Sequence, residues 1–255
     1  MWQVQTKNSS LFPQILWDGC ENKKNRLSQA FLKQPAYSAE TLKKLLQEQI
    51  PYNIKFGDCK KRVLVAATSL NTCSCQVFDS THPHHRAIGA VDILLASSAA
   101  PTYFPPHSIP TPILEPETAP KHPTKTIWAD GGLTCNNPAF ECVATLLKDG
   151  CALKDIHVLS IANGRQPHTP DPTQYGKMGL IDWGRSLVPI CMDVSSEGAH
   201  KKCQTILSEQ NYLRIDPLLG EKIELDNYSK ATAILLPLAE HVADENRDRI
   251  QTWLM

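Results

Sequence analysis

The chain has 255 residues, of which 42% are hydrophobic and 20% are charged. This composition excludes intrinsic disorder and is ordinary for a globular protein that buries a substantial core. The 26 basic residues equal the 26 acidic residues in number, so the charge gives no reason to expect a nucleic-acid partner or an anionic membrane surface.

Cysteine use and the N-terminal sequence indicate a cytoplasmic protein with reduced thiols. The nine cysteines are odd in number and contain no Cys-x-x-Cys pair, which disfavours a zinc ribbon, a thioredoxin-type motif and a disulfide framework. The N-terminus lacks a basic stretch followed by an apolar run, so no signal peptide is expected. The apolar segment 88–100 is too short to cross a bilayer and contains Asp92.

The first half of the chain contains one clear helix and two predicted strands. Ser38 opens the helix, leucines recur after it at helical spacing, and Pro51 ends it. The apolar, β-branched run 62–68 is typical of a buried strand in a mostly parallel sheet. A shorter strand is expected at 76–78, after a turn-like segment at 69–74.

Helices and strands alternate through the rest of the chain. The predicted elements are a small-residue helix at 90–100, a Pro-rich loop at 105–123, a strand at 126–129, a helix at 138–148, a strand at 156–161, a loop at 163–173, one or two helices at 182–209, a strand at 211–216, a helix at 227–242 kinked at Pro237 and an amphipathic helix at 244–254. This alternation implies an α/β fold around a mainly parallel sheet flanked by helices. No repeat or linker stands out, so residues 1–255 are predicted to form a single domain.

The segment with the most chemical content is Trp128-Ala-Asp-Gly-Gly-Leu-Thr-Cys-Asn-Asn-Pro138. A carboxylate held at the end of a buried strand can act as general base for a serine hydroxyl, and Asp130 is predicted to stand there. Gly131 and Gly132 would allow tight backbone dihedrals and leave space for a substrate, while residues 136–138 can cap the next helix. The alternative is an ordinary strand-to-helix turn, which the Asp-Gly-Gly tripeptide alone would favour.

This turn and other segments resemble the patatin-like phospholipases, whose Ser-Asp dyad takes its aspartate from an Asp-Gly-Gly or Asp-Gly-Ala turn. Asp130 matches that acid. The other landmarks follow the family's order along nearly the whole chain: Leu11-Phe12-Pro13, Val63-Leu-Val-Ala-Ala67, Ala96-Ser-Ser-Ala-Ala-Pro-Thr-Tyr-Phe104, Asn136-Asn-Pro-Ala139, Val158-Leu-Ser-Ile-Ala-Asn-Gly164 and Tyr212-Leu-Arg-Ile215. In the fifth of these, Asn163 departs from the family's Gly-Thr-Gly step. The resemblance implies a three-layer, patatin-like α/β fold.

The chain departs from the family at the nucleophile. A Gly-x-Ser-x-Gly elbow needs two glycines four positions apart, and no pair of the 12 glycines has that spacing. A Gly-rich loop that would supply backbone N–H donors to an oxyanion is missing as well. The resemblance therefore implies an N-terminally truncated domain whose elbow precedes Met1. The serines that could act as substitutes are interpreted as ordinary polar residues: Ser9, Ser10, Ser69, Ser97 and Ser98.

By this resemblance the chain is part of a lipid acyl hydrolase that acts on lipid or acyl-ester substrates. Asp130 would accept the serine proton, Gly131 and Gly132 would shape the turn, no metal or organic cofactor is implied, and membrane contact would be transient. Without the elbow the chain is expected to be inactive, as a fragment, a truncated gene product or a pseudoenzyme. The alternative is a non-catalytic lipid-binding or regulatory module that keeps the apolar cleft.

Three other segments have both a functional and an ordinary interpretation. The histidines of 82–85 could bind a metal, but no acid or thiol at ligand spacing supports a site, and an exposed loop is favoured. Cys73 and Cys75 could be redox-active or ligate a metal, but packing of one thiol is favoured. The apolar residues of 183–203 could face lipid, but core packing is favoured.

Overall fold

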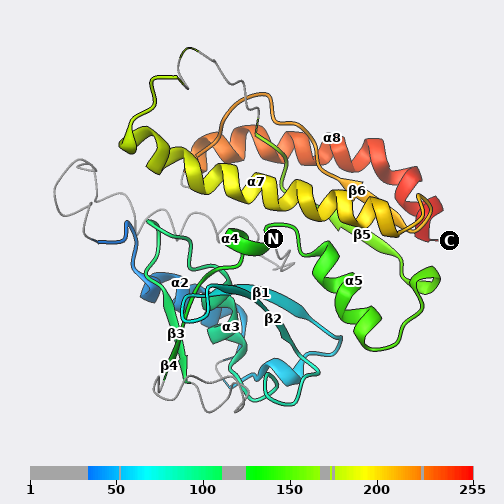
Figure 1. Cartoon of the computed structure of the whole chain (residues 1–255), viewed down its shortest axis with the longest axis horizontal. Coiled ribbons are helices and arrows are strands. Elements are labelled where there is room, and N and C mark those ends of the chain that lie inside the picture. Colours follow the sequence, from blue (N-terminus) through cyan, green and yellow to red (C-terminus); the bar gives the residue numbers. More distant parts are fainter. Residues whose placement is uncertain are drawn as a thin grey trace. The chain divides into compact units, whose positions relative to one another are not determined.

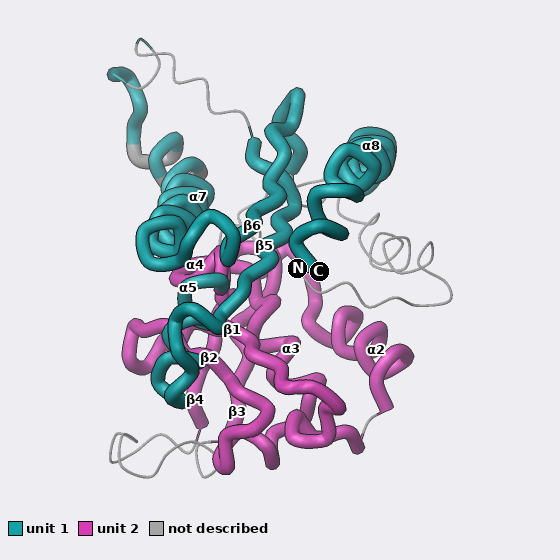
Figure 2. Tube along the Cα trace, turned by 90° about the vertical axis from the view of Figure 1, so that its right-hand side faces the viewer, with its two compact units in different colours: residues 1–4, 139–255 teal, residues 5–138 magenta. Residues whose placement is uncertain are grey.

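The computed structural model describes residues 34–51, 53–110, 125–166, 173, 176–224 and 227–254 (Figure 1). These form two compact units, one within residues 5–138 and the other containing residues 139–255 (Figure 2). Both units combine helices and strands, so the predicted α/β class is confirmed. The single-domain organisation stays a prediction, and the landmark at 11–13 lies outside the described residues.

The unit within residues 5–138 is built on a four-stranded antiparallel sheet in the order β2-β1-β4-β3. Its strands are β1 (Leu64–Ser69), β2 (Ser74–Asp79), β3 (His107–Pro110) and β4 (Lys125–Asp130). β1 lies inside the sheet and pairs with β2 along its length and with β4 over its last three residues. The register pairs Ala67 with Asp130, so the acid of the Asp-Gly-Gly turn lies beside the centre of the sheet.

The expectation of a mainly parallel sheet is not confirmed in this unit. The apolar run of β1 indicates that both of its faces are buried, which is common in parallel sheets but does not set the direction of a strand. Only residues 70–73 join β1 to β2. A link this short permits an antiparallel hairpin, whereas a parallel crossover needs about a dozen residues or more. Among the described strands, the parallel pair is β5–β6 in the other unit.

An apolar core holds helix α3 (Ala90–Ser97) within the unit of the four-stranded sheet. Ile93 and Ala96 of α3 are fully buried in the same cluster as Val65, Phe78 and Trp128 of the strands. The rings of Phe78 and Trp128 meet edge to face, with 5.0 Å between their centroids. Burial of each large apolar side chain stabilises the fold by about 1.5–3 kcal/mol. The remaining members of this core are Phe56, Ala67, Ile88 and Ile109.

Helix α2 (Ala39–Gln49) begins and ends as the sequence predicts. The Ser38 hydroxyl accepts a hydrogen bond from the backbone N–H of Glu40 at 3.2 Å, which satisfies one of the unpaired donors at the helix start. Leu45 is buried, and the helix closes before Pro51 with a bond from Ile50 N–H to the Leu46 carbonyl. A short 3-10 helix, η1 (Phe56–Asp58), follows.

The unit containing residues 139–255 combines a parallel strand pair with longer helices. Its elements are α5 (Ala139–Lys148), the 3-10 helix η3 (Leu153–Asp155), β5 (Val158–Ile161), α7 (Leu180–Ile206), β6 (Tyr212–Ile215) and α8 (Tyr228–Leu254). In Figure 2, α7 and α8 lie on either side of the β5–β6 pair. Val143 of α5 and Cys203 of α7 are fully buried in its core, together with Ile156, Leu207 and Tyr212.

A nearly buried arginine joins both strands of this unit to α7. The Arg214 guanidinium donates to the hydroxyl of Ser160 at 2.7 Å, to the hydroxyl of Ser196 at 3.1 Å and to the carboxylate of Asp216 at 2.8 Å. The Arg214 and Asp216 side chains are only 10% and 11% exposed. A buried charge is tolerated when it is paired and hydrogen-bonded in this way.

Three elements differ from their predicted extents. α7 is one helix that contains Pro189, and α8 is one helix that contains Pro237 and continues to Leu254. Proline removes a single hydrogen bond, so a helix whose other bonds remain can continue past it. β3 lies within the predicted Pro-rich loop, where an edge strand tolerates Pro110. In the parts of the chain that are described, no helix has the length and apolar character needed to cross a bilayer.

Candidate active site

Asp130 is the last residue of β4, and its backbone is held by the segment that follows α3. Its N–H donates to the carbonyl of Ala99 at 3.0 Å, and the next N–H, of Gly131, donates to the carbonyl of Ser97 at 3.2 Å. The chain then turns directly into the short helix α4 (Gly132–Cys135). The small-residue segment after α3 and the acidic turn, far apart in the sequence, are therefore joined by main-chain hydrogen bonds.

The Asp130 carboxyl group is partly buried, and a hydrogen bond fixes the position of one of its two oxygens. Its Oδ1 accepts a hydrogen bond from the backbone N–H of Gly132 at 2.7 Å. Burial raises the pKa of Asp130 above its ordinary value, and the Gly132 N–H opposes that rise only in part. No hydrogen bond joins Oδ2 to any residue in the described ranges, so this oxygen can accept a proton. A carboxylate with a raised pKa is a stronger base than an ordinary aspartate.

Because burial raises the pKa of Asp130, we expect Asp130→Asn to stabilise the folded chain at neutral pH. Because the pKa of Asp130 is higher in the folded state than its ordinary value of 3.8, the protonated carboxyl group favours the folded state. This contribution to the free energy of unfolding is fully present below pH 3.8 and is lost as the pH rises through the folded-state pKa. Asparagine removes the buried charge and keeps an oxygen that can accept the Gly132 N–H. Thermal melts should give a higher midpoint for the variant at pH 7 and equal midpoints below pH 3.8. Equal melting at pH 7 would show that the buried charge costs nothing.

Position 131 requires glycine because the backbone of β1 lies close to it, and not because its φ and ψ angles are unusual. Its φ of −61° and ψ of −27° are ordinary helical values, which corrects the expectation that this glycine serves a special backbone conformation. A Cβ atom at this position would lie 2.2 Å from the carbonyl oxygen of Ala66 and 2.7 Å from its carbonyl carbon. Since both atoms belong to the backbone of β1, a side chain at position 131 would push the acidic turn away from the sheet.

Replacing Gly131 with alanine should destabilise the unit that contains the sheet by about 1–3 kcal/mol, the usual cost of overpacking a closed site. The control is Gly198→Ala in α7, where no atom lies within 4 Å of the added Cβ. Alanine should stabilise that helix by about 0.5–1 kcal/mol relative to glycine. Chemical denaturation of the two variants measures both effects. A Gly131→Ala variant as stable as the parent would contradict the close approach.

Two of the serines considered as possible substitutes, Ser69 and Ser98, have other partners. The Ser69 hydroxyl accepts a bond from Thr72 N–H at 3.3 Å, and the Ser98 hydroxyl donates to the carbonyl of Leu94 at 2.7 Å. No hydrogen bond connects any serine of the described segments to the Asp130 carboxyl group. Residues 9 and 10 lie outside those segments. The described part of the chain thus contains a candidate base without a paired serine nucleophile.

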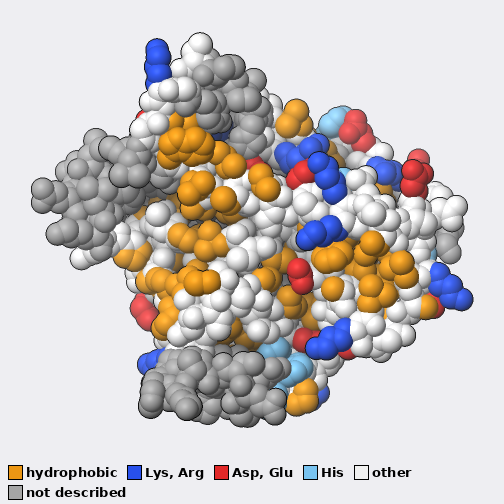
Figure 3. Space-filling model, in the orientation of Figure 1, with side chains coloured by type: hydrophobic (Ala, Val, Ile, Leu, Met, Phe, Trp, Pro, Cys, Tyr) orange, Lys and Arg blue, Asp and Glu red, His pale blue; other side chains and the backbone are white. Residues whose placement is uncertain are grey.

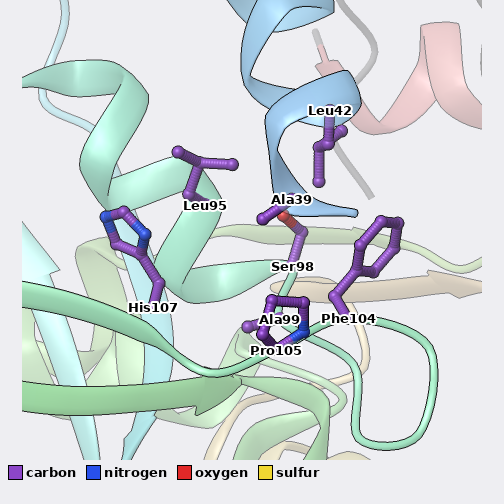
Figure 4. A pocket seen from close by; sticks show the side chains of 8 residues that line it. All are labelled: Ala39, Leu42, Leu95, Ser98, Ala99, Phe104, Pro105 and His107. Atoms are coloured by element: carbon purple, nitrogen blue, oxygen red, sulfur yellow. The ribbon is translucent and has the colours of Figure 1, made fainter. Parts of the chain in front are cut away.

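A small cavity in the same unit is separate from the Asp130 carboxyl group (Figure 4). Its lining residues are Ala39, Leu42, Leu95, Ser98, Ala99, Phe104, Pro105 and His107. The volume of about 10 Å³ leaves room for roughly one water molecule and none for an acyl chain. His107 at its edge contacts Asp92, 3.2 Å from Nε2 to Oδ1, and this hydrogen bond lowers the pKa of Asp92. No bond joins Ser98 to His107, so these three side chains do not form a Ser-His-Asp triad.

The histidines of segment 82–85 and the cysteines Cys73 and Cys75 do not form a metal site. His85 is buried, its Nδ1 accepts the backbone N–H of Asp79 at 3.0 Å, and its ring packs on Phe78. Cys73 is exposed at the end of the β1–β2 turn, with φ of 52°, and Cys75 is a partly buried residue of β2. Within the ranges that the structure describes, no group of three or more His, Cys, Asp or Glu side chains could hold a metal ion.

Three apolar side chains in the N-terminal and central turns of α7 are exposed to solvent. Trp183, Leu187 and Val194 are 45%, 51% and 68% exposed, so core packing does not explain these three, whereas Cys203 of the same segment is fully buried in the core as expected. Hydrophobic side chains are visible over this part of α7 in Figure 3. Their spacing of four and seven residues repeats along one side of a helix. These three side chains therefore lie outside the core, along one side of α7.

Sequence reasoning missed the residues that hold the acid in place. Thr68 donates a hydrogen bond from its hydroxyl to the Asp130 carbonyl at 2.8 Å, and the hydroxyls of Thr68 and Thr134 are 2.9 Å apart. The carbonyls of Ser97 and Ala99 complete the set. The one signal available beforehand was a threonine at the end of the apolar run 62–68, a polar side chain that a buried strand must pair.

Comparison with known proteins supports a single family. The family model described as patatin-like phospholipase matches residues 2–143, more than half of the chain. A protein named cGAMP-activated phospholipase from Vibrio cholerae is 28% identical over 221 residues, which cover 78% of this chain and 59% of that protein. A protein of the same name from Escherichia coli is 27% identical over 224 residues, with the same coverage. Patatin-like protein 3 of Arabidopsis thaliana is 32% identical over 149 residues, covering 49% of this chain and 33% of that protein. The chain thus spans about 59% of the length of the two bacterial relatives.

Proposed function

Because the chain belongs to the patatin-like phospholipase family, we propose that it is part of a lipid acyl hydrolase in which Asp130 is the proton acceptor of a Ser-Asp dyad. One observation carries this proposal: the Asp130 carboxyl group, at the end of β4, has a pKa raised by burial, one oxygen bonded to Gly132 N–H and one oxygen without a described partner. These are the properties of a general base.

In the proposed reaction, the serine hydroxyl attacks the carbonyl carbon of a lipid ester while Asp130 takes the hydroxyl proton. The tetrahedral intermediate collapses when the alcohol leaves with that proton, and an acyl-serine remains. Asp130 then takes a proton from water as the water attacks the acyl-serine, and it returns this proton to the serine oxygen when the second tetrahedral intermediate collapses and the fatty acid leaves. The reaction needs no metal or organic cofactor.

We propose that the serine and the oxyanion donors lie on a segment outside these 255 residues, and that the chain is the remainder of one patatin-like domain. The absence of a Gly-x-Ser-x-Gly sequence from the chain and the greater length of its relatives support this. Translation of the DNA upstream of Met1 is the simplest check. The elbow is expected about 40–70 residues before Phe12, a distance set by one or two βα units.

The second candidate is a non-catalytic lipid-binding or regulatory module. The observation that favours it is the same missing elbow, together with an acid turn that is held firmly without a nucleophile. An upstream reading frame without Gly-x-Ser-x-Gly would support this module, whereas one with the elbow would support the hydrolase.

The proposed partners are a lipid or acyl-ester substrate and, transiently, a membrane surface. The exposed Trp183, Leu187 and Val194 of α7 support such contact, because apolar side chains with a terminal tryptophan suit the boundary between water and lipid. The names of two relatives describe them as cGAMP-activated. Release of fatty acid from phospholipid vesicles by a longer form, measured with and without cGAMP, tests the function.

A further inference from the structure

The hydroxyl groups of Thr68 and Thr134 form a directed chain that ends on the backbone of Asp130. The Asp130 carbonyl oxygen can only accept, so Thr68 donates its single hydroxyl hydrogen to it at 2.8 Å. In the contact of 2.9 Å between Thr68 and Thr134, the donor must therefore be Thr134. Thr68 is 6% exposed, so water cannot readily replace either bond.

These two hydroxyl groups lie at the end of β4, where its pairing with β1 stops. The ladder between β1 and β4 ends at the pair Ala67–Asp130, so β1 pairs with no residue of the turn that follows. At this last pair, the Asp130 N–H donates to the carbonyl of Ala99, and the Asp130 carbonyl accepts from the hydroxyl of Thr68. Both peptide groups that flank the Asp130 Cα atom are thus anchored, which leaves the direction of its side chain little freedom.

From this geometry we propose that Thr68 is a positioning residue for the Asp130 carboxyl group, with Thr134 as its hydrogen-bond donor. The inference rests on the proposed function, in which Asp130 is the base. Thr68 reaches the backbone of Asp130 and not its carboxyl group, so it acts through the orientation of the acid. A displacement of about 1 Å at a reacting group costs up to roughly 100-fold in rate, so loss of the Thr68 hydroxyl should lower kcat by about 10- to 100-fold and leave KM nearly unchanged.

A purely structural role would give a different pattern. If Thr68 only satisfied a buried carbonyl, its removal would lower the melting temperature without altering the environment of the carboxyl group. If it positions the acid, its removal lets the acidic turn shift, the carboxyl group becomes less buried, and the pKa of Asp130 falls toward its ordinary value. The titration of Asp130 therefore separates the two roles, even without catalysis.

The experiment uses four variants of the 255-residue chain. Thr68→Val keeps the shape and removes the hydroxyl, Thr68→Ser keeps the hydroxyl, and Thr134→Val removes the outer donor to Thr68. The matched control is Thr145→Val in α5, whose hydroxyl also donates to a carbonyl at 2.8 Å, that of Glu141. The midpoint for Asp130 is read from the carbon-13 shift of its carboxyl group as the pH is varied.

We expect Thr68→Val to lower the Asp130 midpoint, Thr134→Val to lower it less, and Thr68→Ser and Thr145→Val to leave it unchanged. An unchanged midpoint in folded Thr68→Val would overturn the proposal. If Thr68→Val does not fold, Thr134→Val decides, and an unchanged midpoint in that variant overturns the proposal equally. In a longer form with the elbow, failure of the dyad itself would appear as full activity of Asp130→Asn, whatever these midpoints are.

Discussion

In a longer form of the protein that carries a Gly-x-Ser-x-Gly elbow, Asp130→Asn should lower lipid-ester hydrolysis by about 100- to 10,000-fold, the usual contribution of a general base. The amide keeps the shape of the carboxyl group and can accept the Gly132 N–H, but it cannot take a proton from serine. The loss should appear in kcat, measured as fatty acid released from phospholipid vesicles.

The matched control for this substitution is Asp155→Asn, which removes the charge of an exposed aspartate in η3. It should leave hydrolysis within a factor of about two, because an exposed charge is screened by solvent and contributes little. Circular dichroism and melting should show that both variants are folded. A loss of only a few-fold in stable Asp130→Asn would mean that Asp130 has a structural role and that the dyad assignment is wrong.

The 255-residue chain alone should release no p-nitrophenol from p-nitrophenyl esters, and no fatty acid from phospholipids, above the rate in buffer. A general base accelerates the reaction only through a nucleophile that it can deprotonate, and no described serine is bonded to Asp130. The expected effect is total, since the whole contribution of covalent catalysis is missing.

The same assay on three variants identifies the source of any activity. Turnover that purifies with the protein and disappears in Asp130→Asn would reveal a serine within the chain. Ser69→Ala and Ser98→Ala would then test the two serines whose present partners are known. Turnover that survives Asp130→Asn would indicate a different site. Either kind of turnover would contradict the inactivity proposed for this chain.

Local sequence was sufficient wherever the deciding interactions lie between near neighbours. Ser38 caps α2 through an N–H two residues away, and Pro51 follows its end, so both limits of this helix were predictable. The end of β4 and the Asp-Gly-Gly turn were predictable for a similar reason, because an apolar strand that meets an acid and two glycines must turn. The order of family landmarks then made Asp130 the candidate acid, and the family match agrees with the resemblance itself.

The direction and partners of the strands were decided by tertiary contacts. An apolar run reports how buried a strand is, but the antiparallel order β2-β1-β4-β3 depends on which strands meet. Residues 107–110 form β3 because they pair with β4, and this pairing could not be predicted from a Pro-rich local sequence. Likewise, the exposure of Trp183 and Leu187 depends on which side of α7 the core occupies.

At the candidate site, the sequence by itself determined the candidate acid and the turn that carries it, because they are consecutive residues. Only the tertiary structure decided how the acid is held. The bonds from Thr68, Ser97 and Ala99 to the turn span 31 to 62 positions of the chain, and Gly131 is glycine because the backbone of Ala66 lies against it. Contacts of that kind follow from the packing of β1, β4 and the end of α3, and no local pattern of residues encodes them.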